Sequence, residues 1–141
     1  MATLTKFNDF AEQIGKGVHN FSAHTFKVGL TNTAPNAATN TGYGDITEIS
    51  AGNGYTAGGN TLTCSWSETS GTAKLTITDS VFTASGGSIG PFRYAVIYND
   101  TATSPADALV GYLDYGSALT LAATETFTLD FDATAGVLTI A

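Results

Sequence analysis

The sequence is poor in charged residues, because Asp, Glu, Lys and Arg together make up only 12% of its 141 residues. This is about half of the usual share in globular proteins. The net charge is −7, and the five basic residues are scattered along the chain. A nucleic-acid-binding protein needs clustered Lys and Arg to replace the counterions of the phosphates. We therefore expect no nucleic-acid partner. A surface with few charges of either sign loses little hydration energy when a partner protein covers it, which suits assembly. A chain kept soluble by its acidic residues would have the same composition, so both interpretations stay open.

Cysteine is also scarce, and the single residue Cys64 excludes an intrachain disulfide. It lies in the alternation Leu62-x-Cys64-x-Trp66, which predicts a small buried hydrophobic residue. The N-terminal residues lack the apolar segment of about 7 to 15 residues that a signal peptide requires. No apolar run approaches the ~18 residues of a membrane span. We expect a chain that is made in a reducing cytoplasm and has no membrane partner.

Small residues and threonine dominate what remains, with 24 Thr, 20 Ala and 16 Gly. Thr favours strands and Gly favours turns, whereas the helix formers Lys, Glu and Arg are scarce. Hydrophobic residues make up 43% of the chain, and its length suits one domain with a sizeable core. The composition predicts a mainly β protein.

One helix is predicted, over Lys6 to Gly15, with Thr5 as its cap. Its apolar residues follow the helical spacing i, i+3, i+4, i+7: Phe7, Phe10, Ala11 and Ile14. Gly15 is a natural stop. A helix of about ten residues does not hold its shape alone in water, so this apolar stripe must pack against something. We expect residues 1–20 to form an N-terminal helical arm, with Phe7, Phe10 and Ile14 as contacts to a neighbouring subunit.

Beyond the helix the apolar residues alternate with a period of two. The predicted strands are His24–Thr31, Leu62–Trp66, Ala73–Ile77, Pro91–Asn99, Leu109–Tyr115, Thr126–Asp132 and Val137–Ile140. The connection Glu68–Gly71 has a length that suits a hairpin between Leu62–Trp66 and Ala73–Ile77. Pro91–Asn99 is apolar on both faces, which predicts a central strand, and Val137–Ile140 is expected to pair with its predecessor. The pattern is typical of an antiparallel β-sandwich or jelly roll of about seven to eight strands, formed by residues 21–141 with a short N-terminal helix before it.

A long connection at about residues 32–60 interrupts this rhythm, and loops of that length are often functional. Asp45–Ile49 is expected to form a helical turn within it. Gly52–Ala57 matches the dinucleotide fingerprint G-x-G-x-x-A, but no helix follows that could hold a pyrophosphate. We therefore interpret the segment as a structured loop with positive φ angles at its glycines and Asn53. Its small, uncharged residues suit close approach to a partner, with Asn53 and Tyr55 as further assembly contacts.

No set of residues supports catalysis. Gly86–Gly90 matches G-x-S-x-G, but a proline and a strand follow Ser88 where a hydrolase has a helix. His19 and His24 lie five residues apart and are expected on opposite faces, which makes a poor metal site. Asp130 and Asp132 share one side of a strand, where solvated carboxylates are more common than a cation site. We expect a protein that is not an enzyme and has no cofactor or metal.

Three blocks of the sequence carry a resemblance to a known group of proteins. They are Ile49–Gly59 with the strand after it, Phe92–Asp100 continuing through Pro105–Gly116, and Thr126–Phe131 with Gly136–Ile140. Together they resemble small structural proteins encoded in the virion gene blocks of tailed bacteriophages, some of which are head decoration, or cement, proteins. The resemblance implies a β-sandwich that is made in the host cytoplasm, becomes part of the virion and binds the major capsid protein, most simply as a trimer.

Two other functions fit the same sequence. A tail or fibre component would place tyrosines such as Tyr43, Tyr55, Tyr98 and Tyr112 on one exposed ridge to contact a glycan. A carbohydrate-binding sandwich would use Trp66 as a platform, although the alternation around Trp66 favours a place in the core.

Overall fold

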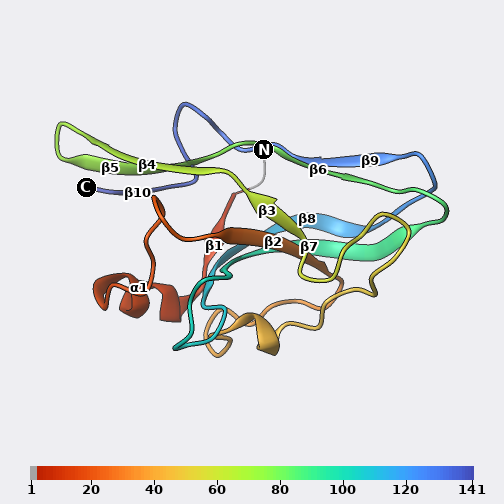
Figure 1. Ribbon diagram of the computed structural model, residues 1–141, viewed down its shortest axis with the longest axis horizontal. Helices are drawn as coiled ribbons and strands as arrows, with labels where there is room; N and C mark the ends of the chain where they lie inside the picture. Colours follow the sequence, from red (N-terminus) through yellow and green to blue (C-terminus); the bar gives the residue numbers. More distant parts are fainter. Residues whose placement is uncertain (1–2) are drawn as a thin grey trace.

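Two layers of antiparallel strands form the protein in the computed structural model, which describes residues 3–141 (Figure 1). The first layer is one sheet in the order β1-β8-β7-β2-β3: Thr5–Lys6, Leu109–Leu121, Ile89–Asn99, Phe26–Thr31 and Asn60–Leu62. The second layer contains two small sheets, β10-β5-β4 (Leu138–Ile140, Thr72–Ile77, Cys64–Thr69) and β6-β9 (Ser80–Thr83, Thr126–Leu129). Strand makes up 47% and helix 8% of the protein. The prediction of a mainly β antiparallel sandwich with one short helix is confirmed.

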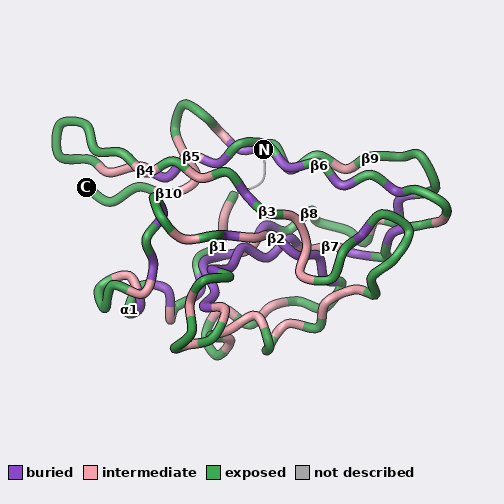
Figure 2. Tube along the Cα trace, viewed as in Figure 1, coloured by how far each residue is buried: buried purple, intermediate pink, exposed green. Residues whose placement is uncertain are grey.

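The central strand β7 is covered on both faces, as its apolar sequence predicts. Ala95 and Ile97 belong to the main core between the two layers, whereas Val96 and Tyr98 belong to a second apolar cluster on the opposite face. All four are at least nine-tenths buried, and burying a large apolar side chain contributes about 1.5–3 kcal/mol. Buried residues concentrate on β7 and its neighbour β2, while the tip of the β4–β5 hairpin is exposed (Figure 2).

The long connection, residues 32–59, covers the sheet on the side away from the second layer (Figure 1). Its 3-10 turn η1 (Tyr43–Asp45) begins two residues before the predicted helical turn. The Tyr43 ring stacks on Tyr98 at 3.9 Å between centroids. This approach requires a glycine at position 29 in β2, because a Cβ there would overlap the Tyr43 hydroxyl. The connection is therefore a packed third layer and not a free extension.

The N-terminal segment is joined to the sandwich. Thr5 does not cap the helix; it lies in β1 and pairs with Tyr112 of β8. The helix α1 (Asn8–Gly15) follows Phe7, which has an extended backbone and provides no side-chain cap. Phe7 is fully buried in the cluster with Tyr98, and Phe10 is buried in the main core. The expectation that these two side chains contact a neighbouring subunit is therefore wrong, because the home sandwich already covers them.

The last strand does not pair with its predecessor. The Asp132 carboxylate accepts hydrogen bonds from the backbone N–H groups of Thr134 and Ala135, which turns the chain after β9. Val137 then donates to the Leu75 carbonyl at 2.7 Å, and β10 pairs with β5. The short partner of β9 is instead β6, which the periodicity did not predict. The predicted hairpin between β4 and β5 is confirmed.

Candidate functional site

A wide bulge interrupts β8 opposite the start of β7. Phe92 pairs with Leu119 and Tyr94 pairs with Asp114, so the four residues 115–118 lie opposite Arg93 alone. Gly116, at φ +98°, adopts the left-handed conformation that this excursion requires. Bulges redirect side chains and are common next to functional sites. This one presents the Tyr115 side chain, which is 54% exposed.

An ion pair fixes the bulge. Arg93 donates from Nε to Asp114 Oδ1 at 2.8 Å and from Nη2 to Oδ2 at 3.1 Å. Asp114 Oδ1 also accepts from the Gly116 backbone N–H at 2.8 Å, so one carboxylate joins β7 to the turn of the bulge. The hydrogen bonds from Arg93, and then that from Gly116, hold the pKa of Asp114 below its usual value. The charges of Arg93 and Asp114 are matched by each other, whereas Asp130, which lines the neighbouring cavity, is exposed and has no ion pair within residues 3–141.

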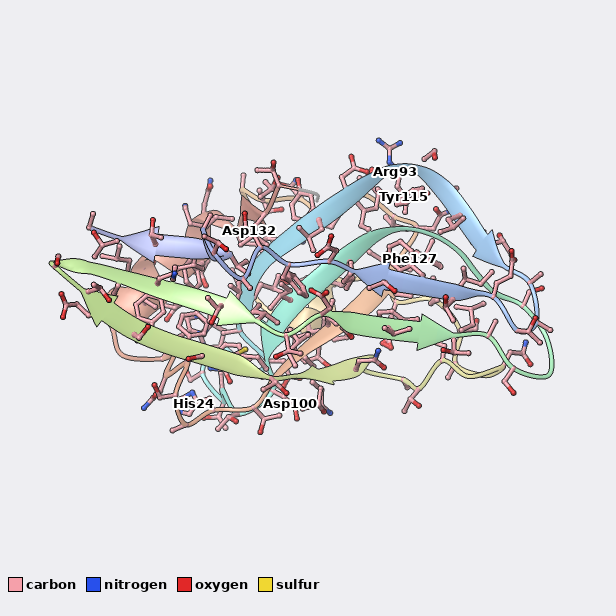
Figure 3. The ribbon with its side chains drawn as sticks, turned by 90° about the horizontal axis from the view of Figure 1, so that it is seen from above. His24, Arg93, Asp100, Tyr115, Phe127 and Asp132 are labelled. Atoms are coloured by element: carbon pink, nitrogen blue, oxygen red, sulfur yellow. The ribbon has the colours of Figure 1, made fainter. Side chains whose placement is uncertain are left out.

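An aromatic row lies beside the bulge. The Tyr115 and Phe127 rings meet edge to face at 5.6 Å, and Phe127 meets Phe92 in the same way at 5.1 Å. Arg93, Tyr115 and Phe127 gather along one long side of the molecule, whereas His24 lies on the opposite side (Figure 3). Such edge-to-face pairs add about 0.5–1.5 kcal/mol beyond the burial of their area, so Phe127 gives the exposed Tyr115 ring a fixed support.

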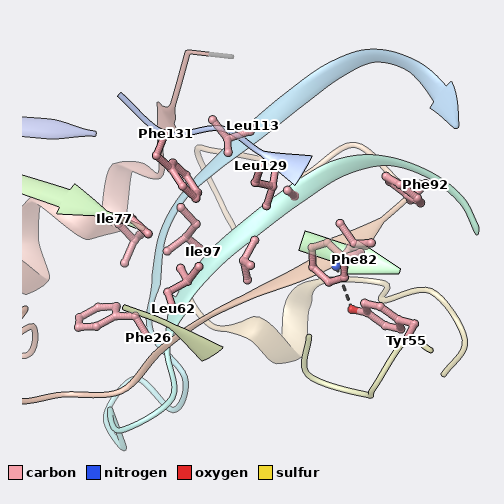
Figure 4. Close-up of a cluster of buried hydrophobic side chains, with 14 of the residues drawn as sticks. Phe26, Tyr55, Leu62, Ile77, Phe82, Phe92, Ile97, Leu113, Leu129 and Phe131 are labelled. Atoms are coloured by element: carbon pink, nitrogen blue, oxygen red, sulfur yellow. Dashed lines mark hydrogen bonds between the residues drawn. The ribbon is translucent and has the colours of Figure 1, made fainter. Parts of the chain in front are cut away.

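A cavity of about 190 Å³ opens between β7, β8 and β9 at this row. Its walls include core residues, among them Phe92, Leu113 and Leu129, which point into the space between the layers (Figure 4). Within residues 3–141, β9 pairs only with β6, so its other edge carries unpaired backbone groups. We call the cavity, the Tyr115 side chain and this free edge of β9 the β8–β9 seam. An apolar cavity next to fixed polar groups is the usual form of a binding site.

Of the remaining predicted contacts, Tyr55 is not available to a partner. It is 3% exposed, and its hydroxyl accepts a hydrogen bond from the Leu30 backbone N–H at 2.9 Å (Figure 4). Asn53 is exposed, and its Nδ2 donates to the Ser88 carbonyl at 3.0 Å. Ile14 is half-buried and lines a groove of about 290 Å³ between α1 and β10, together with Leu4 and Ile140. Asn53 and Ile14 remain predicted contacts.

The two sequence motifs lie in turns. Gly52 and Tyr55 exchange two backbone hydrogen bonds, of 2.8 and 3.0 Å, which closes a tight turn, and a strand rather than a helix comes next. Positive φ is confirmed at Asn53 (56°), Gly54, Gly58 and Gly59, and Gly52 also has a positive φ. Ser88 lies in the connection between β6 and β7.

The two histidines converge instead of diverging. Asn99 Nδ2 lies 3.2 Å from Nδ1 of His19 and 3.0 Å from Nδ1 of His24. The expectation of opposite faces is wrong because the chain is not extended here: the Asn20 side chain accepts from the N–H groups of Ser22 and Ala23 and folds a turn. Burial lowers the pKa of His19 to about 4, with a smaller contribution from His24. Within residues 3–141, no three His, Cys, Asp or Glu side chains gather as metal ligands.

The tyrosine ridge of the tail or fibre hypothesis does not form. Tyr55 and Tyr98 are buried, and Tyr98 donates its hydroxyl to the Gly58 carbonyl at 2.6 Å. Trp66 stacks on Phe21 at 5.3 Å and packs against the main core, as its alternation predicted. The sequence analysis missed Tyr115. Its signal was Gly116 within a strand pattern, since a glycine there often marks a bulge.

No family model, no curated protein and no solved structure matches the chain. None of the helices in residues 3–141 is long and apolar enough to cross a membrane.

Proposed function

We propose that the protein is a non-enzymatic structural protein of a tailed-bacteriophage virion. In this proposal it is a decoration protein that binds the outer surface of the head, contacts the major capsid protein and stabilises the shell. The sequence resemblance supplies the kind of particle. One structural observation carries the proposal further: most of the basic side chains are already bonded within the chain.

That observation rests on the basic side chains. Three of the five form ion pairs within the chain: Lys16 with Glu12, Lys27 with Asp100, and Arg93 with Asp114. A fourth, Lys74, donates to the Thr134 carbonyl at 2.7 Å. Burying an unpaired charge in an interface costs several kcal/mol, whereas a hydroxyl or a pre-paired charge costs less. Self-paired cations therefore suit a surface that a partner covers.

Exposed small residues complete this surface. The exposed part of the β8 bulge and the outward residues of β9 are mostly uncharged, with Gly116, Ser117, Ala118, Thr126 and Thr128 in exposed positions. Small side chains allow a partner backbone to approach closely. A protein that binds only the assembled shell stabilises it by mass action, in proportion to the logarithm of its free concentration.

The proposed assembly state is a trimer at a symmetry axis of the head. A closed ring requires a heterologous contact, in which one patch of a subunit meets a different patch of the next. The groove between α1 and β10, with Ile14 and the 47%-exposed Ile140, is one such patch. Sedimentation analysis measures the oligomeric state of the purified protein, and images of decorated heads show its state on the particle. A monomer in both measurements would contradict the trimer.

The test of the function uses particles that lack the protein. Heads from a phage with the gene disrupted are mixed with purified protein and imaged by cryo-electron microscopy. We expect saturable binding on the outer head surface and a higher temperature of head disruption. We expect binding through the uncharged residues of the β8 bulge and β9, so raising NaCl from about 0.05 to 0.5 M should change occupancy by less than about twofold. Density on the tail alone, or no binding, would refute the proposal.

A further inference from the structure

We propose that β9 accepts an extended segment of another protein as an added strand, with one apolar side chain of that segment seated in the cavity of the β8–β9 seam. The inference depends on the proposed function only for where the segment comes from, a neighbouring protein of the particle. The geometry of the seam carries the rest.

The first observation is the free edge of β9. Over Thr126–Leu129 this strand pairs with β6 on one side, and within residues 3–141 no strand pairs with its other side. An unpaired edge presents a row of N–H and C=O groups that another chain can use. Proteins usually blunt such an edge with a very short strand, Lys, Pro or a covering loop. β9 is short, with four residues. The β9 residues Thr126, Phe127, Thr128 and Leu129 include neither Lys nor Pro.

The second observation is the cavity beside that edge. Its volume is about 190 Å³, and an apolar cavity of about 150 Å³ is enough to hold benzene. It therefore accommodates one Leu, Ile or Phe side chain. The walls formed by Leu113 and Leu129 continue the core, so an apolar group placed there completes the packing between the layers.

The two observations point to the same ligand. A strand added to β9 extends the small β6–β9 sheet along the cavity toward β8, where Leu113 is buried and Tyr115 is exposed. Alternate side chains of a strand face opposite ways, so one apolar residue enters the cavity and its neighbours face solvent. Peptide recognition by strand addition works in this way, with affinity from main-chain hydrogen bonds and specificity from pockets.

Other occupants fit less well. A sugar ring needs several free polar side chains around it. Of the two charged residues that line the cavity, Arg93 is bonded to Asp114, which leaves Asp130 alone without an ion pair within residues 3–141. A second copy of the chain is less suitable, because within residues 3–141 its alternating apolar segments are already paired as strands β2 to β10. The favoured partner is a different protein with an extended, uncharged segment that carries one large apolar residue.

The experiment uses the isolated full-length protein and a displayed library of random peptides of about ten residues. We expect enriched peptides to share one large apolar residue flanked by strand-forming residues. In ¹⁵N-labelled protein, a synthetic copy of such a peptide should shift the amide signals of residues 113–116 and 126–130. Replacing the shared apolar residue with Ala should weaken binding roughly tenfold.

N-methylation of the peptide backbone tests the strand geometry directly. Methylation at alternate residues, whose N–H groups face β9, should weaken binding roughly tenfold, whereas methylation at the intervening residues should have little effect. In the protein, Tyr115→Ala should weaken binding roughly fivefold. Ile140→Ala is the matched control, because Ile140 is an exposed apolar residue in the separate groove between α1 and β10. It should leave binding unchanged.

Three results would overturn the inference: no enriched peptide, signal shifts outside the seam, or binding that is insensitive to N-methylation at every position. Because no heads are present, the outcome is separable from that of the proposed function. If peptides fail but heads are decorated, strand addition is refuted and the function stands. If peptides bind but heads are not decorated, the function is refuted and strand addition stands.

Discussion

The two faces of the five-stranded sheet are covered to different extents. On one face the connection 32–59 seals the sheet, and the hydroxyls of Tyr43, Tyr55 and Tyr98, in and beside this connection, all form hydrogen bonds. Tyr43 donates to Glu48 at 3.0 Å, Tyr55 accepts from Leu30, and Tyr98 donates to Gly58. At the β8–β9 end of the other face, the Tyr115 hydroxyl forms no hydrogen bond within residues 3–141, and the layers stand apart around a cavity.

The difference teaches which parts of the chain serve the fold and which are free for a partner. Glu48 accepts hydrogen bonds from Tyr43 and from the Gly58 backbone, so it joins two points of the sealing loop. Burial raises the pKa of Tyr55 to about 12, which keeps its hydroxyl neutral. A buried network of this kind rigidifies a fold when every member is satisfied. The seam has no such network, and its exposed aromatic ring is a typical interface residue.

The largest effect is expected from Phe7→Ala on the sealed face. Phe7 is fully buried and its ring lies 5.4 Å from that of Tyr112. Removing it should lower the free energy of unfolding by about 4 kcal/mol, through lost burial and the cavity left behind. Urea denaturation followed by circular dichroism measures this. Ile14→Ala, at a half-buried position in the helix that follows Phe7, is the control and should cost much less. Equal costs would mean that the helix is not anchored as described.

A truncation that begins at Ser22 extends this test. It removes β1, α1 and both buried phenylalanines, Phe7 and Phe10. We expect the remaining chain to lose cooperative unfolding and dispersed NMR signals. A folded, soluble truncation would show that the N-terminal segment is an independent arm after all.

The second largest effect is a loss of stability in acid through His19. Its pKa is lowered from 6.5 to about 4 in the folded protein, first by burial and then by His24, with Asp9 opposing. The unfolded chain therefore binds more protons in this interval. The contribution is fully present above pH 6.5 and is lost as the pH falls to about 4. At ~1.4 kcal/mol per pH unit this amounts to ~3 kcal/mol.

The variant His19→Phe isolates this contribution, because the ring is surrounded by Phe10, Phe21 and Phe26. The difference in unfolding free energy between wild type and variant should change by ~3 kcal/mol between pH 7 and pH 4. A difference that stays constant with pH would show that His19 does not titrate as described.

The third effect concerns the contact between the sealing loop and β2. A Cβ in Gly29→Ala would overlap the Tyr43 hydroxyl, so the Tyr43 ring must move off Tyr98. Overpacking of this kind costs about 1–3 kcal/mol. The double variant Gly29→Ala, Tyr43→Ala removes the clash and should be less destabilised than the sum of the two single variants. Additive costs would place the strain elsewhere.

The sequence predicted the elements whose signal is local. The alternation of Phe26, Val28 and Leu30 and the doubly apolar Pro91–Asn99 placed the central strands, and Glu68–Gly71 placed the β4–β5 hairpin. The pairing of β10 with β5 was not predictable, because it depends on a turn made by the Asp132 side chain and on a non-local partner. β1 and β6 are too short to show a period.

The candidate site was predictable only in part. The helical stripe of Phe7 and Phe10 correctly required a covering surface, but periodicity does not tell a home sheet from a neighbouring subunit. Tyr55 was expected to contact a partner, but the structure buries it within the protein. The seam arises from three distant strands, β7, β8 and β9, whose meeting no single stretch of sequence encodes.

The smallest effect on stability is expected from Tyr115→Ala. A small cost would separate this seam residue from the buried tyrosines of the sealed face. The ring is 54% exposed and its main support is the edge-to-face contact with Phe127, so its removal should change the free energy of unfolding by no more than about 0.5–1 kcal/mol. Tyr98→Ala, at a buried tyrosine of the sealed face, should cost about 3 kcal/mol or more, because it also leaves the Gly58 carbonyl without its donor. Both values come from urea denaturation under the same conditions. If Tyr115→Ala proves as costly as Tyr98→Ala, the bulge serves the fold, and the division between a sealed face and an open seam fails. If it costs little, Tyr115 is a large aromatic side chain held in place at almost no benefit to the free chain, which is the signature of a residue kept for a partner.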